Sequence, residues 1–142
     1  MKQYLFVCTR ESFDITKSIW VIGFHDRSWT LNIELPKVEI GDRIYFYISK
    51  ERVLVWFASV TETLYYDDKI IYPNSKELCI RRLGVKINKN NSCDFNWLIS
   101  KLDFIKKKEW VVWSAYLVKN FIKLSDHDIK IFEDALSNNP NL

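Results

Sequence analysis

The fold depends most on two stretches of this chain, Tyr4-Leu5-Phe6-Val7-Cys8-Thr9-Arg10 and Val38-Glu39-Ile40-Gly41-Asp42-Arg43-Ile44-Tyr45-Phe46-Tyr47. The first is apolar up to Cys8 and then becomes polar, which predicts a strand over residues 4–8. In the second, Gly41 tolerates a positive φ and Asp42 bonds locally to the backbone, so this pair predicts a tight turn. An alternating strand over residues 43–49 follows the turn.

More strands and one short helix surround these stretches. The helix is expected over residues 11–18, with Phe13 facing inward. The further strands are expected over residues 19–22, 53–61 and 78–87. The strand at 53–61 is nearly all apolar, which predicts burial on both faces with Trp56 in the core. Gly84 interrupts the last of these strands and indicates a bulge or a close approach of another backbone.

The C-terminal third carries helical signals. Residues 95–102 predict a short helical segment, whose inward residues are expected to be Trp97, Leu98 and Leu102. Ser125 and Asp128 form a capping pair for a last helix, and apolar residues then recur at helical spacing. We therefore predict a single α+β domain over residues 1–142, a small twisted barrel with a mixed sheet, flanked by short helices and a C-terminal helix.

Composition narrows the classes of function. The chain carries a net charge of +3, and residues 101–123 contribute +4 of it through six lysines against Asp103 and Glu109. Such a basic face is a modest footprint for phosphates, and a solvated surface explains it equally well. Three unevenly spaced cysteines without a CxxC pair indicate reduced thiols and a cytoplasmic location. We expect no cofactor, no metal and no membrane partner, because histidines are few and no apolar run reaches 18 residues.

Catalytic motifs are poorly represented. The sequence contains no GxSxG, no GxxxxGK[ST] and no GxGxxG. Asp67-Asp68 could bind Mg²⁺, but adjacent acids in a tyrosine-rich loop are more often solvated. His25 beside Asp26 is the one histidine that could serve acid–base chemistry on a nucleotide, whereas His127 is expected to face solvent.

Binding of a nucleobase fits the remaining residues better. A base reader needs aromatic walls, polar groups aimed at the base edge, and cations for the phosphates. Trp20 offers a wall, and Thr9 and Arg10 lie next to it at the end of the first strand. The loop tyrosines that could add a second wall are Tyr65, Tyr66 and Tyr72.

The ordered set of motifs resembles the EVE domain, a PUA-like barrel related to the YTH domain. The resemblance covers residues 4–136 and rests on these segments: Phe6-Val7-Cys8-Thr9-Arg10-Glu11, Ile19-Trp20-Val21, Thr30, Gly41-Asp42 with Phe46-Tyr47, Tyr66-Asp67 with Ile71-Tyr72, Arg81, Phe104-Ile105-Lys106, Trp113-Ser114 and Lys119. It implies a non-catalytic module that holds one flipped, modified base of RNA or DNA in an aromatic pocket. Tyr116 stands where the family's pattern usually has a histidine.

Residue placement and the resemblance together give the candidate sites. The base pocket comprises Thr9, Arg10, Trp20, Val21, Trp29, Tyr66, Trp113 and Ser114. The contacts to the nucleic-acid backbone comprise Arg81, Arg82, Lys106, Lys107, Lys108 and Lys119. Trp20 could instead be a core residue, and Trp113 serves either role. We expect the protein to be a monomer. The alternative functions are a protein–protein adaptor that uses the aromatic loop at residues 64–72, and a nucleotide-processing enzyme centred on His25.

Overall fold

The computed structural model describes residues 1–24, 29–76, 78–89, 91–106 and 120–138, with backbone alone at 29, 30 and 138. Its strands are β1 (Gln3–Cys8), β2 (Val21–Phe24), β3 (Arg43–Ile48), β4 (Val53–Tyr66), β5 (Arg81–Ile87), β6 (Ser92–Asp94) and β7 (Phe121–Lys123). Its α-helices are α1 (Arg10–Ile19), α2 (Trp29–Glu34) and α4 (Asp126–Asn138). The 3₁₀ turns are η1 (Leu35–Lys37), η2 (Phe95–Trp97) and η3 (Ile99–Lys101). No described helix has the length and apolar content needed to cross a membrane.

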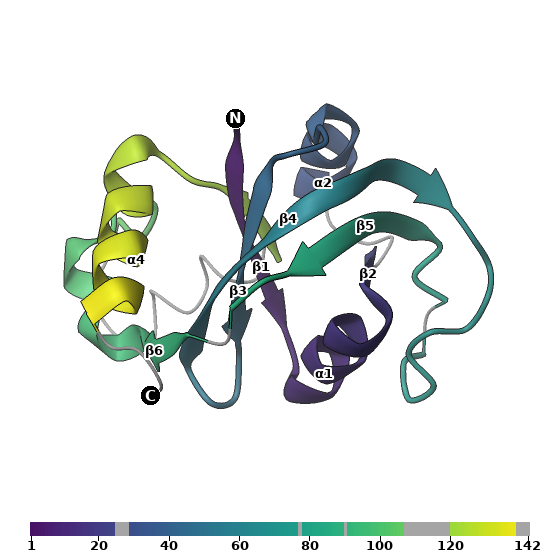
Figure 1. Ribbon diagram of the computed structural model, residues 1–142, viewed down its shortest axis with the longest axis horizontal. Coiled ribbons are helices and arrows are strands. Elements are labelled where there is room, and N and C mark those ends of the chain that lie inside the picture. Colours follow the sequence, from purple (N-terminus) through teal and green to yellow (C-terminus); the bar gives the residue numbers. More distant parts are fainter. Residues whose placement is uncertain (25–28, 77, 90, 107–119, 139–142) are drawn as a thin grey trace.

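One mixed sheet curls through the molecule in the order β2-β5-β4-β3-β1-β7, with β6 added to β4 (Figure 1). β1 and β3 are parallel, and the other pairs are antiparallel. β2 and β7 lie at the two ends of this order, so the described sheet is a half-barrel with a seam between β2 and the β1–β7 pair. The α+β architecture with a C-terminal helix agrees with the prediction from sequence.

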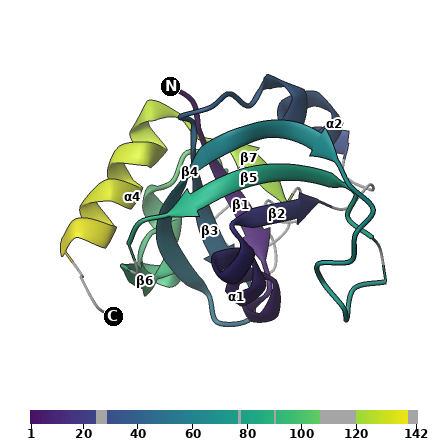
Figure 2. The ribbon, with the colours of Figure 1, turned by 45° about the vertical axis from the view of Figure 1, so that its right-hand side comes forward.

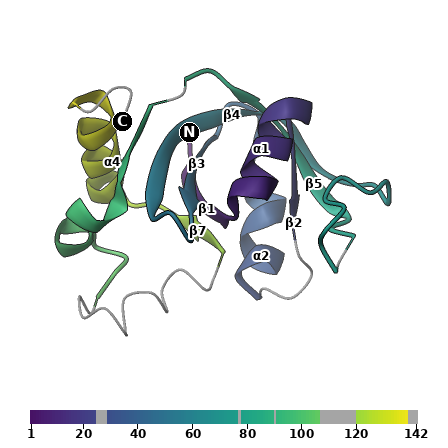
Figure 3. The same cartoon turned by 90° about the horizontal axis from the view of Figure 1, so that it is seen from below.

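Alternation along β3 divides the interior into two cores. Ile44, Phe46 and Ile48 join the aromatic cluster inside the curl, together with Phe13 of α1. Tyr45 and Tyr47 face the opposite side, where Phe132 of α4 packs. Figure 3 shows α1 and α2 on one side of the sheet and α4 on the other, and Figure 2 shows the same arrangement obliquely. Because strand side chains alternate with a period of two, one continuous apolar strand can serve both cores.

Two helix termini show how local chemistry fixes these elements. Thr9 caps α1, since its hydroxyl oxygen accepts from the N–H of Ser12. Ser125 caps α4 by accepting from the N–H of Asp128, as the sequence predicted. The buried carboxylate of Asp128 accepts from the N–H groups of Asp103 and Phe104, at 2.7 and 3.1 Å, and so joins α4 to the segment after η3.

Several boundaries differ from the prediction. α1 continues to Ile19, so the second strand starts at Val21 rather than at residue 19. β4 extends to Tyr66, five residues beyond the predicted end. Trp97 was expected to face inward and is 77% exposed, because residues 95–102 form two 3₁₀ turns rather than one helical repeat. Trp56 is buried as predicted.

Gly84 provides the close approach that the sequence indicated. A Cβ at this position would lie 2.7 Å from the Cβ of Glu62 on β4, where the β4–β5 register shifts. We expect Gly84→Ala to lower the free energy of unfolding by about 1–3 kcal/mol through overpacking. In a chemical-denaturation cycle with Glu62→Gly, the double variant should be more stable than the sum of the single changes, and strict additivity would contradict the contact.

Candidate functional site

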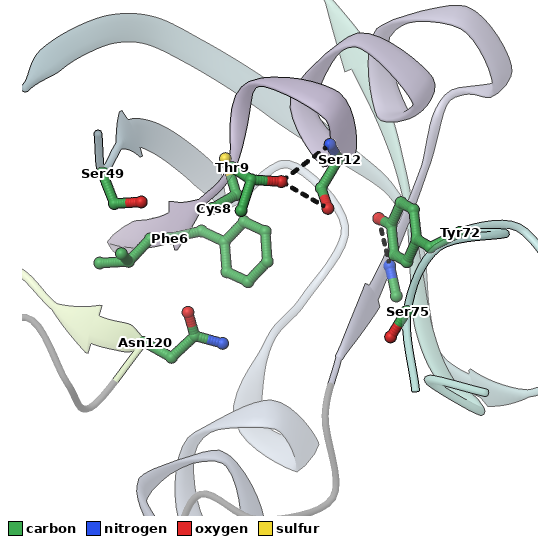
Figure 4. A pocket seen from close by; sticks show the side chains of 10 residues that line it. Phe6, Cys8, Thr9, Ser12, Ser49, Tyr72, Ser75 and Asn120 are labelled. Carbon is green, nitrogen blue, oxygen red and sulfur yellow. Dashed lines mark hydrogen bonds between the residues drawn. The ribbon is translucent and has the colours of Figure 1, made fainter. Parts of the chain in front are cut away.

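A cavity of about 210 Å³ lies in the seam of the half-barrel (Figure 4). Residues from both sides of the seam line it, together with the loop between β4 and β5 and the residue before β7. The lining residues are Phe6, Val7, Cys8, Thr9, Ser12, Gly23, Ser49, Tyr72, Ser75 and Asn120. We call this space the seam cavity. Its position follows from the topology, since β1 and β2 both contribute to it without pairing with each other.

The first wall is the junction between β1 and α1. Thr9 ends the strand in an extended conformation, and its hydroxyl donates to Oγ of Ser12 at 3.1 Å while accepting from the N–H of the same residue. Both hydroxyl groups thereby lie at the N-terminus of a ten-residue helix, where the helix dipole is positive. The ring of Phe6 faces the cavity from β1, between Thr9 and Asn120 (Figure 4).

The opposite wall depends on Tyr72 and Gly23. The N–H of Gly23 donates to the hydroxyl of Tyr72 at 3.0 Å, and that hydroxyl also bonds to Oγ1 of Thr16 on α1 at 2.9 Å. This arrangement satisfies a backbone donor on the free edge of β2. A Cβ at Gly23 would lie 3.0 Å from Cε2 of Tyr72, so glycine permits the loop to pack this closely. Burial raises the pKa of Tyr72, so its hydroxyl is neutral.

Asn120 and Ser49 complete the lining beside β1. The backbone carbonyl of Asn120 accepts from the N–H of Val7 at 2.8 Å, and its φ of 67° is left-handed, a conformation that asparagine tolerates well. The N–H of Ser49 donates to the carbonyl of Cys8 at 3.0 Å. Both residues are thus fixed through their backbones, which leaves their side chains to define the cavity surface.

The described lining of the seam cavity is polar but uncharged. Four hydroxyl-bearing side chains, those of Thr9, Ser12, Ser49 and Ser75, surround it, in addition to the phenol and one amide. Burial raises the pKa of the Cys8 thiol to about 12, with Arg10 opposing that shift, so the thiol is also neutral at pH 7. A neutral polar lining suits a ligand with hydrogen-bonding edges and no charge of its own.

The volume limits the ligand to one ring system. Apolar cavities of about 150 Å³ accept a benzene molecule, and pockets for drug-sized ligands start at about 300 Å³. The seam cavity, at about 210 Å³, lies between these sizes. It therefore matches a small heterocycle better than a whole nucleotide or a peptide.

Of the predicted pocket residues, the structure places Thr9 in the cavity lining. Arg10 was expected to read the base edge, but its guanidinium forms a bidentate ion pair with Glu51 at 2.7 and 2.8 Å. Val21 begins β2 and is half-buried. Tyr66 ends β4 with 67% of its surface exposed, and neither of these two residues lines the seam cavity.

Trp20 lies outside the cavity lining as well. It follows α1 in the left-handed conformation, with φ 61°, its N–H donating to the carbonyl of Thr16 and its carbonyl accepting from the N–H of Val85. For a residue other than glycine this conformation costs about 1–2 kcal/mol. The side chain is 51% exposed, so the interpretation of Trp20 as a core residue does not hold.

The two arginines predicted to contact phosphates are buried. Arg82 is 2% exposed, and its guanidinium binds the carbonyls of Lys69 and Cys79 and the carboxylate of Asp67, so it fixes both ends of the β4–β5 loop. Arg81 donates to Oδ1 of Asn32 on α2. Neighbouring strand residues point to opposite faces of the sheet, so Arg82 supports the loop that carries Tyr72 while Arg81 contacts α2, and neither contributes to an open phosphate surface.

Most of the remaining predicted residues lie outside the described part of the chain. Lys106 is exposed. The residues outside the described part of the chain are Trp113, Ser114, Lys107, Lys108 and Lys119. The side chain of Trp29 is also outside it, as is the whole of His25, on which the enzyme alternative depends. The other lining residues carry only weak signals in the sequence. Gly23 is one of only three glycines, and Ser75 and Asn120 have no distinguishing pattern.

Among the described residues, one group of potential metal ligands occurs away from the cavity. Asp103, His127 and Asp128 bring ligand atoms within 4.8 Å of one another. The Asp128 carboxylate already accepts two backbone N–H groups, and Nε2 of His127 lies 2.9 Å from the carbonyl of Lys101. These bonds account for the grouping without an ion.

No protein-family model matches this chain, and no curated protein matches it significantly. Solved structures share its fold. Protein Atu2648 from Agrobacterium tumefaciens has a TM-score of 0.67 at 14% identity, covering 99% of this chain and 97% of its own. Rpa0253 from Rhodopseudomonas palustris has a TM-score of 0.65 at 11% identity, covering 97% and 94%. The YTH domain of Mmi1, solved in complex with RNA, has a TM-score of 0.67 at 8% identity, covering 96% and 78%. The chain therefore has a YTH-like, PUA-like fold.

Buried thiols and phenols make the stability of the protein sensitive to high pH. Burial raises the pKa of Cys8 from 9.0 to about 12. The unfolded chain releases this proton first, so the stabilisation is complete below about pH 9 and is lost as pH rises toward 12. Above pH 9 we expect the unfolding free energy of Cys8→Ala to decrease less steeply with pH than that of the parent chain, by at most about 1.4 kcal/mol per pH unit. Parallel curves for the variant and the parent, measured by denaturation between pH 7 and 11, would contradict the buried neutral thiol.

Proposed function

We propose that this chain is a non-catalytic nucleic-acid-binding module that takes one flipped nucleobase, with a modified base as its ligand, into the seam cavity. The observation that carries the proposal is the cavity itself, which combines a volume of about 210 Å³ with an uncharged described lining. The fold likeness to an RNA-bound YTH domain supports the same conclusion. The lining residues determine which rings would stack on the base and which polar groups would form hydrogen bonds with its edge.

The chemistry of the lining favours a base over a phosphate. A phosphate needs cations or several convergent N–H donors, whereas a base presents neutral donors and acceptors at its edge. Thr9, Ser12 and Asn120 offer such partners, and the rings of Phe6 and Tyr72 supply apolar walls. We therefore assign the aromatic walls to Phe6 and Tyr72, the second of which belongs to the loop tyrosines singled out from the sequence.

The same lining supports a binding role rather than catalysis. A general acid or base needs a titratable group whose pKa lies near the working pH. The described residues of the cavity include no carboxylate, imidazole or amine, and the Cys8 thiol keeps its proton well above neutral pH. We infer that the protein holds its ligand without altering it.

Exposed apolar side chains at the end of β4 and in the β4–β5 loop favour a second function, protein binding. Tyr66, Ile70 and Leu78 are 67%, 66% and 50% exposed, which is unusual for large apolar side chains. An adaptor that used them would bind its partner with little dependence on salt. A nucleic-acid binder loses affinity as salt rises, because phosphate contacts release counterions.

Filling the seam cavity should weaken base binding. We expect Ser12→Phe to place a ring in the cavity and to weaken binding to a fluorescein-labelled single-stranded 12-nucleotide RNA, or its DNA counterpart, by about 10- to 100-fold through lost base stacking. Anisotropy titration measures this, and Ser18→Phe, on an exposed position of the same helix, is the matched control.

The comparison of these two variants decides the proposal. If both bind as tightly as the parent chain while remaining folded, the seam cavity does not receive the base. If the parent binds neither oligonucleotide, nor any free nucleoside by tryptophan fluorescence, the nucleic-acid function itself fails and the adaptor function becomes the one to test.

A further inference from the structure

Trp20 combines two features that the fold does not require. Its backbone is left-handed at φ 61°, a conformation that favours glycine at the end of a helix. Its side chain is also 51% exposed, so about half of a large apolar surface faces solvent. Residues held in sparsely populated backbone conformations cluster at functional sites, where the surrounding structure holds them in place.

The surroundings of Trp20 hold it firmly. Its carbonyl accepts from the N–H of Val85 at 3.0 Å, which extends the β2–β5 ladder by one residue. The next residue of β5, Lys86, places its Nζ over the Trp20 ring in a cation–π contact, 5.9 Å from the ring centre. Within the described part of the chain no carboxylate forms an ion pair with Lys86. An exposed ring and an available cation are thus fixed side by side on the sheet.

This pair is separate from the seam cavity. Thr9 and Ser12, at the N-terminus of α1, line the cavity, whereas Trp20 follows the C-terminus of the same helix. A ten-residue helix is about 15 Å long, so one base cannot contact both places. Stacked nucleotides rise by about 3.4 Å each, and the gap therefore corresponds to several stacked nucleotides or fewer extended ones.

We infer that Trp20 and Lys86 form a second nucleotide site, in which a base a few nucleotides along the strand from the cavity-bound one stacks on the indole and its phosphate contacts the ammonium group. This inference rests on the proposed function. It adds a path for the bound nucleic acid, which runs along α1 from the cavity to β5. The occupant is a nucleotide because stacking on an aromatic face next to a cation is the combination used for single strands. A purely apolar partner would gain nothing from Lys86.

The test compares a nucleoside, which reaches the cavity alone, with an oligonucleotide long enough to reach both places. Trp20→Gly removes the ring. Relief of the left-handed backbone strain stabilises the variant, and loss of the half-buried ring surface destabilises it. Because these effects oppose each other, its melting temperature should stay within about 4 °C of the parent. We expect it to weaken binding of the labelled single-stranded 12-mer by about 5- to 150-fold. Affinity for the free nucleoside that binds the parent chain best should not change.

Two controls make the result specific. Trp97→Gly removes a more exposed indole on the α4 side of the sheet and should leave 12-mer affinity unchanged. Lys86→Gln should reduce the slope of log affinity against log salt by about 0.7, and Lys86→Arg should restore it.

Three outcomes would overturn the inference while leaving the seam cavity intact. The first is unchanged 12-mer affinity in Trp20→Gly when Ser12→Phe weakens binding. The second is an equal loss in Trp97→Gly, which would show non-specific stacking. The third is an equal loss of nucleoside and 12-mer binding in Trp20→Gly, which would place Trp20 at the cavity. Absence of any binding by the parent chain would instead refute the proposed function and this inference together.

Discussion

Burial of the central strands on both faces is the constraint on which the rest of this structure depends. β3 is buried along nearly its whole length, with Phe46 in one core and Tyr45 in the other. Both faces of the sheet must therefore be covered, and α1 and α2 cover one face while α4 covers the other. The chain leaves β1 through α1 and returns as β2, which pairs only with β5. The seam between β1 and β2 is the consequence, and the cavity lies in it.

The polar groups at the seam serve structure and ligand binding at once. Tyr72 satisfies the N–H of Gly23 on a free strand edge and contributes a wall of the cavity. Arg82 holds the loop that carries Tyr72 by binding carbonyl groups near both of its ends. A site built in this way is pre-organised, because each lining side chain is placed by backbone bonds that form whether or not a ligand is present. This is the physical link between the half-barrel and the proposed capture of a base.

Elements set by local pattern were predictable, and positions set by distant contacts were not. The alternating strand after Gly41, the helix behind Thr9 and the Ser125 cap follow from neighbouring residues, and they agree with the sequence prediction. Trp97 was misplaced because 3₁₀ turns break the helical period. Arg82 was assigned to phosphates because the local sequence does not reveal that the β4–β5 loop supplies carbonyl partners for its guanidinium. Tyr72 meets Thr16 across 56 residues, so the cavity wall that it forms has no local signature.

The most direct test of the central claim is to locate the ligand on the backbone of the protein. Amide resonances of the ¹⁵N-labelled chain can be followed while a single-stranded RNA or DNA oligonucleotide is added. The account predicts that the largest shifts occur at the cavity amides, foremost the N–H of Gly23 that donates to Tyr72 and the N–H of Ser12 that donates to Thr9. Shifts confined to Tyr66 and Ile70, with the cavity amides unmoved, would contradict it.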